Sequence, residues 1–214
     1  MFSMFAYPKT TSVNDLNKEK ILGGIGLKPV RADELKYLVK NWKELEKLGV
    51  FMNDIDTSLI TSMKDLFRAE ADFNQPIDSW DTGNVTDMTG MFYKALSFNQ
   101  PINNWNTGKV TTMRSMFAIA EEFNQPLNNW DTNQVTNMRE MFQAAHAFDH
   151  PIDKWDTGKV TNMSGMFHDA RKFNQTINTW NTENVKDMNH MFRSASNFPS
   201  HQFACCQISL PVEL

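Results

Sequence analysis

The sequence predicts an α/β repeat solenoid, in which short coils of chain stack in one direction. A 25-residue unit recurs without interruption from Phe73 onward, and a period of roughly 20 to 50 residues is typical of repeat architectures. Within a unit, apolar residues first alternate with polar ones, as in a strand, and then recur at steps of three and four, as in a helix. One unit has too few large apolar side chains to offset the cost of ordering its backbone, so each unit has to stack on the next.

The interior is predicted by the residues that stay constant from unit to unit. Every full unit begins with phenylalanine and then has tryptophan, valine and two methionines at fixed places, the second methionine being followed by phenylalanine. The tryptophans are Trp80, Trp105, Trp130, Trp155 and Trp180. We expect identical residues of successive units to lie above one another in the core, and the variable residues to form the surface.

A short parallel strand is expected around the tryptophan of each unit. In the first full unit this strand covers about residues 79–83, where alternation along a strand would turn Trp80 and Thr82 inward and Ser79 and Asp81 outward. The spacing of the apolar residues here follows their order in a leucine-rich repeat. We therefore predict a right-handed, leucine-rich-repeat-like coil whose parallel strands are in register.

A short helix or 3₁₀ segment is expected after the strand. Met88, Met91, Phe92 and Ala95 recur at steps of three and four residues, which places them on one face of a helix. The FNQP corner then turns the chain into the next unit, because proline cannot donate to a ladder and asparagine suits a turn.

The repeats occupy most of the chain and are flanked by shorter segments. We expect a solenoid over 50–198, made of a degenerate coil at 50–72 and full repeats at 73–97, 98–122, 123–147, 148–172 and 173–197. A partly mobile N-terminal extension, 1–30, and a helical cap, 31–49, come before it, and a C-terminal tail or cap, 199–214, comes after it.

The cap is predicted as one amphipathic helix that begins at an N-cap, Asp33, and stops at Gly49. Its apolar stripe comprises Leu35, Leu38, Val39, Trp42, Leu45 and Leu48. Such a helix would cover the strand edge and core of the first coil, which would otherwise face water. Binding of a partner by this helix is the alternative.

The units resemble BspA-like leucine-rich repeats, in the 25-residue form W-D-T-x-x-V-T-x-M-x-x-M-F that is found in many bacterial surface proteins and lipoproteins. The resemblance covers residues 48–198 and implies a leucine-rich-repeat-like solenoid with a role in adhesion or protein binding. Members of that family often have an export signal or a lipid anchor, whereas the first residues of this sequence do not read as a signal peptide. The expected location is therefore the cytoplasm by default, while the resemblance implies the cell surface or secretion.

Composition and charge argue against several classes of protein. The formal net charge is −4, so the chain lacks the basic surplus typical of nucleic-acid-binding proteins. No apolar run reaches about 18 residues, the length that a membrane span needs. The two cysteines, Cys205 and Cys206, are adjacent and cannot build a disulfide framework. We expect a monomer with no nucleic-acid partner and no membrane span.

No arrangement of residues in the sequence has the pattern of a catalytic or metal site. The five histidines occupy different places in the repeat and form no stacked ligand cluster, and no Ser-His-Asp, Cys-His or paired-carboxylate arrangement recurs. We therefore predict no enzyme activity, no metal and no cofactor. The alternatives are a calcium ion between Asp131 and Asp156, instead of solvated carboxylates, and acylated or reactive cysteines instead of plain thiols.

Protein recognition is the predicted function, adhesin-like or effector-like, with the partner on the strand face of the solenoid. The partner-binding residues are predicted to be Ser79, Asp81, Asn104, Asn106, Asn129, Asp131, Lys154, Asp156, Thr179 and Asn181. Their short polar side chains lose little entropy on binding, which favours them over the helical side with Tyr93, Ala118, Gln143, His168 and Arg193. An intracellular immunity-type or sequestering interaction protein is the alternative function.

Overall fold

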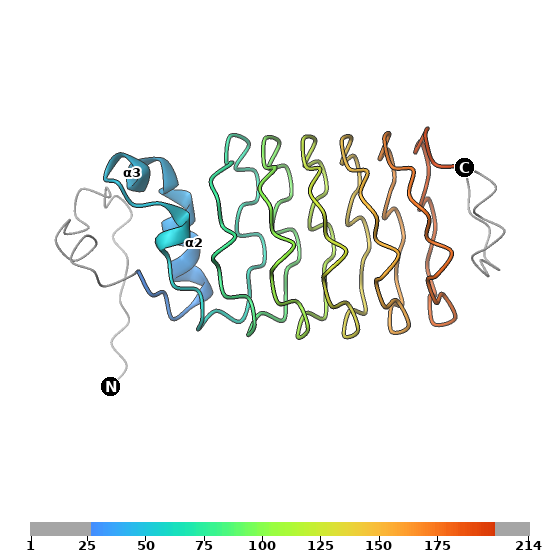
Figure 1. Ribbon diagram of the computed structural model, residues 1–214, viewed down its shortest axis with the longest axis horizontal. Coiled ribbons are helices and arrows are strands. Elements are labelled where there is room, and N and C mark those ends of the chain that lie inside the picture. Colours follow the sequence, from blue (N-terminus) through green and yellow to red (C-terminus); the bar gives the residue numbers. More distant parts are fainter. Residues whose placement is uncertain (1–26, 200–214) are drawn as a thin grey trace.

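The computed structural model of the protein describes residues 27–199, which form a row of stacked coils with two helices at its N-terminal end (Figure 1). The helices are α2 (Ala32–Lys40) and α3 (Trp42–Lys47), and a 3₁₀ turn, η2 (Met52–Asp54), follows them. From there to the C-terminal end, the coils lie side by side along the longest axis of the molecule. Each coil repeats the course of the one before it after 25 residues.

The segment predicted as one helix is divided in two at Asn41. Asn41 has φ −109° and ψ 17°, and its side-chain Nδ2 donates to the Tyr37 carbonyl, so the backbone leaves the helical path there. Residue Arg31, not Asp33, is the N-cap of α2. The apolar faces of both helices are buried, and Trp42 meets Phe73 edge-on with ring centroids 5.5 Å apart.

The core consists of columns of identical aromatic side chains. Neighbouring tryptophans along the stack, such as Trp105 and Trp130, have ring centroids 6.4 Å apart and planes within 3° of parallel. Phe92 stacks both on Phe98 of the next coil, at 4.0 Å, and on Phe117, at 5.4 Å. These side chains are at most 3% exposed, so the fixed residues of the repeat form the interior.

The predicted strand in each repeat is wrong. Within residues 27–199 the β-pairing between successive coils is limited to isolated parallel bridges, and the tryptophan segment makes none of them. The bridged residues of the repeats are Ser62, Asp87, Thr112, Asn137, Asn162 and Asp187. Side chains join the coils at the tryptophan segment instead: Thr82 Oγ1 donates to the Asn106 carbonyl at 2.9 Å, and Trp105 Nε1 donates to the Ile77 carbonyl at 3.1 Å.

The predicted helix or 3₁₀ segment in each repeat is wrong as well, because consecutive turns take its place. Gly90 and Lys94 have φ of 60° and 59°, and a right-handed helix cannot pass through left-handed residues. Tyr93 N donates back to the Gly90 carbonyl at 3.0 Å, whereas Gly90 N donates to the Arg114 carbonyl of the next coil at 2.8 Å. Backbone N–H groups therefore donate alternately to a carbonyl of the same turn and to a carbonyl of the neighbouring coil. The predicted α/β class is therefore incorrect for the full repeats, which are coils of turns.

Candidate binding surface

One side of the stack is formed by three columns of side chains that come from the consecutive turns, and we call it the turn face. The first column is Lys64, Thr89, Arg114, Arg139, Ser164 and Asn189. The second column is Asp65, Gly90, Ser115, Glu140, Gly165 and His190. The third column is Arg68, Tyr93, Ala118, Gln143, His168 and Arg193. No residue type fills a whole column, in contrast with the constant core.

The turn face is held in place by the backbone ladder beneath it. All six residues of the second column have left-handed φ values between 53° and 61°. In the first five coils the backbone N–H of the second-column residue donates to the next coil, as Ser115 N does to the Arg139 carbonyl at 2.8 Å. The side chains of this face therefore project from a backbone that is fixed coil by coil.

A first hollow of about 340 Å³ lies in the turn face around Gly90. A Cβ atom at Gly90 would clash with Asp65 Oδ1, so the absence of a side chain at Gly90 allows the Asp65 carboxylate to lie close to the backbone of the neighbouring coil. The Arg68 guanidinium lies 4.2 Å from the centroid of the Tyr93 ring and pairs with Asp65 at 3.0 Å, which forms one wall. Lys64 and Arg114 also line this hollow.

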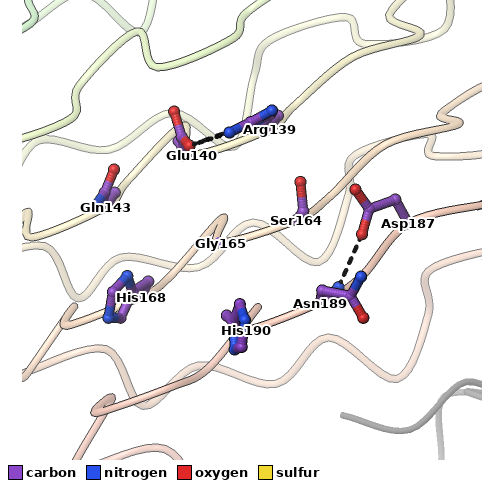
Figure 2. A pocket seen from close by; sticks show the side chains of 9 residues that line it. All are labelled: Arg139, Glu140, Gln143, Ser164, Gly165, His168, Asp187, Asn189 and His190. Carbon is purple, nitrogen blue, oxygen red and sulfur yellow. Dashed lines mark hydrogen bonds and ion pairs between the residues drawn. The ribbon is translucent and has the colours of Figure 1, made fainter. Parts of the chain in front are cut away.

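A second hollow of about 280 Å³ lies farther along the same face, around Gly165 (Figure 2). Figure 2 shows its nine lining residues on three successive passes of the chain, with His168 and His190 on neighbouring passes. Glu140 lines both hollows and pairs with Arg139 at 2.8 Å. The two hollows therefore lie along one continuous strip of the surface.

The turn face is basic although the chain as a whole is acidic. Its three columns contain five lysine or arginine residues and two acidic residues, a surplus of three positive charges with histidine neutral. The whole chain has a formal net charge of −4. Charge is therefore distributed unevenly around the stack, and the turn face attracts anionic groups.

The ten residues predicted to bind a partner all lie exposed on the stack, but none of them lines either hollow. Several of these side chains instead form hydrogen bonds with the backbone of their own or a neighbouring coil. Asp81 Oδ1 accepts from Gly83 N at 2.9 Å, and Thr179 Oγ1 donates to the Asp153 carbonyl at 2.6 Å. Lys154 presents no such side-chain contact within 27–199. Their role in binding stays a prediction.

The sequence reasoning considered only the third column of the turn face and missed the two glycines. The signal that could have found them is positional, since Gly90 and Gly165 are 75 residues, or three repeats, apart. Four other coils have a different residue at the same position of the repeat, namely Asp65, Ser115, Glu140 and His190, so glycine is not required there by the backbone. Both hollows have a glycine at this position in their lining.

Other chemistry on the stack is limited to hydrogen bonds and ion pairs. His146 Nε2 lies 3.0 Å from Asp169 Oδ2, and the Arg171 guanidinium, together with His146, lowers the pKa of Asp169. Among residues 27–199, His, Cys, Asp and Glu form no group of three or more that could hold a metal ion. Within the same stretch, every helix is too short or too polar to cross a bilayer. Cys205 and Cys206 lie outside the described residues.

Residues 33–137 and 125–206 match the family described as "Mycoplasma protein of unknown function, DUF285". Together the two matches cover more than half of the chain. The chain belongs to this family. The first DUF285 match begins within α2 and the second continues beyond the last full repeat, so the family pattern includes the helices as well as the coils. Membership in this family supports the interpretation of the chain as a repeat protein. No curated protein and no solved structure matches the chain.

Proposed function

We propose that this DUF285 protein is a protein-recognition scaffold that holds a partner on its turn face. The observation that supports this most is the pair of hollows around Gly90 and Gly165 on one continuous, variable strip. Binding sites are commonly concave, and repeat proteins place their variable residues on the surface that meets the partner.

Rigidity favours the turn face over the row that was predicted from the sequence. Its backbone is fixed by bonds between coils, so binding need not order it. In the predicted row, by contrast, side chains such as Asp156 already accept from the backbone, here from Gly158 N at 2.9 Å. A partner that bound there would compete with these bonds.

The resemblance to BspA-like leucine-rich repeats refines this proposal. It points to an adhesin-like or effector-like protein of the bacterial surface, which binds without catalysis and as a monomer. An intracellular immunity-type or sequestering protein would use the same face for a different purpose. Fractionation of the native cell, followed by detection of the full chain, would separate the two.

The proposal is tested with a partner captured from the native cell by cross-linking and identified by mass spectrometry. Gly90→Asn combined with Gly165→Asn should fill both hollows and weaken the isolated complex, because asparagine tolerates left-handed backbone better than most residues. The matched control combines Lys154→Glu with Asp156→Lys, which reverses charges in the predicted row. Melting temperatures of both variants show that they fold.

The proposal fails if the filled variant binds as well as the unaltered protein. If the Lys154 and Asp156 exchange alone weakens the complex, the partner sits on the row predicted from the sequence. If neither variant has an effect, partner binding by these two surfaces is excluded.

A further inference from the structure

We infer that the turn face receives an acidic, extended peptide segment of its partner, laid along the stack across the coils. This inference rests on the proposed function and adds the chemistry of the partner. It follows from the charges around the Gly90 hollow, the spacing of the basic residues and the shape of the strip.

The positive charge around the Gly90 hollow is available because the two acidic residues that line this hollow are already paired. Asp65 pairs with Arg68 at 3.0 Å and Glu140 pairs with Arg139 at 2.8 Å. Lys64 and Arg114, both exposed, have no ion-pair partner in the described part of the chain.

Two carboxylates in this hollow would therefore gain one cation each without displacing an existing partner. The hollow also partly shields such a contact from water, which strengthens it relative to a contact on a flat surface.

The spacing of the basic residues suits an extended chain. Lys64 and Arg114 occupy the same column two coils apart, and a ladder spacing of about 4.8 Å separates them by about 10 Å. A peptide in the extended polyproline II conformation advances by about 3.1 Å per residue with three residues per turn, so carboxylates three residues apart lie on the same side and match this separation.

The half-buried ring of Tyr93, which lies against Arg68 and Lys94, forms part of the wall of the hollow between these contacts. A rigid groove needs little rearrangement to bind an extended segment. The entropy cost of binding then comes mainly from ordering the peptide segment.

An acidic peptide fits the strip better than a nucleic acid does. A phosphate backbone is bound by many basic residues at once, and its affinity depends on how many phosphates are neutralised. The three columns of the turn face contain five basic residues, and two of these are paired with carboxylates. The chain as a whole has a net charge of −4. Tyr93 is the one aromatic residue among the three columns, so base stacking has a single platform.

The test is fluorescence anisotropy of the full chain with a fluorescein-labelled glutamate–serine peptide that repeats Glu-Ser-Ser, so that its carboxylates are three residues apart. The peptide should bind in low salt and weaken as the salt concentration rises, because exposed charges are screened. Lys64→Glu combined with Arg114→Glu should weaken binding by about tenfold or more, since each loses an attraction and adds a repulsion. Lys109→Glu combined with Lys159→Glu makes the same charge change at exposed positions outside the turn face and should leave the affinity within about twofold.

Each other result has a defined meaning. Equal binding of a lysine–serine peptide, or unchanged affinity in the double variant, overturns the inference. Stronger binding of a single-stranded oligonucleotide of similar length assigns the strip to nucleic acid and overturns it too.

The milder pair Lys64→Gln and Arg114→Gln guards against misfolding of the reversed variant, and it should weaken the peptide to a smaller degree. If the Glu–Ser peptide fails to bind while Gly90→Asn with Gly165→Asn still weakens the native complex, the proposed function stands and only the acidic chemistry is wrong.

Discussion

Trp130→Ala is expected to lower the free energy of unfolding by about 3–5 kcal/mol, the usual cost of emptying a large aromatic site in a core. Trp130 is 3% exposed. Its ring stacks on Trp105 at 6.4 Å and on Phe117 at 6.1 Å, and aromatic pairs of this kind contribute about 0.5–1.5 kcal/mol each. Its Nε1 donates to the Ile102 carbonyl at 2.9 Å, which adds about 1 kcal/mol.

Trp130→Phe separates these contributions. It keeps an aromatic ring in the column and removes the indole N–H, and the Ile102 carbonyl retains its bond from Trp105 N. The expected loss is therefore smaller, about 1–2 kcal/mol. The exposed neighbour Asn129 provides the control, and Asn129→Ala should change stability by less than about 0.5 kcal/mol.

Urea unfolding, followed by the fluorescence of the other five tryptophans and by circular dichroism, measures these losses. Coincidence of the two signals is needed, because a long stack can unfold in parts. A loss below about 1 kcal/mol for Trp130→Ala would refute the stacked core, since it would mean that the coils collapse around the gap or that the ring is exposed.

Three further predictions concern single contacts. Thr107→Val should cost about 1–2 kcal/mol in urea unfolding, because the buried hydroxyl donates to a carbonyl of the next coil at 2.8 Å and valine cannot. Ala144→Gly should stabilise by up to about 1 kcal/mol, since φ is 51° there, whereas Ala145→Gly next to it, fully buried, should destabilise by about 1 kcal/mol or more. Equal signs for the two would contradict the turn geometry. The hydrogen bond from Lys28 lowers the pKa of Asp56 from 3.8 to about 2, so this contact stabilises above about pH 4 and is lost as the pH falls toward 2. Because both side chains are exposed, Lys28→Met should remove at most about 1 kcal/mol of acid-sensitive stability, measured as the difference between melts at the two pH values.

The period and the interior of this protein follow from its amino-acid sequence alone. Residues such as Trp130 and Phe117 recur every 25 positions, and burial of a large aromatic side chain stabilises any stack that brings the copies together. The outward and inward alternation around Trp80 was also correct, since Asp81 is exposed and Thr82 is 1% exposed.

The local conformation was decided by the tertiary structure. Steps of three and four residues put Met88 and Met91 on one face of a helix, but a turn that closes from residue i to i+3 produces the same spacing. Only the neighbouring coil decides between a helix and consecutive turns. Its Arg114 carbonyl accepts the hydrogen bond from Gly90 N, and this bond offsets the cost of the left-handed backbone.

The same holds for the surface. Gly90 and Gly165 become hollows only because coils on each side bring side chains such as Asp65 and Glu140 beside them, and one repeat read alone contains no such neighbour. Contacts between residues about 25 apart thus decide both the backbone and the candidate site, whereas burial follows from the type of each residue.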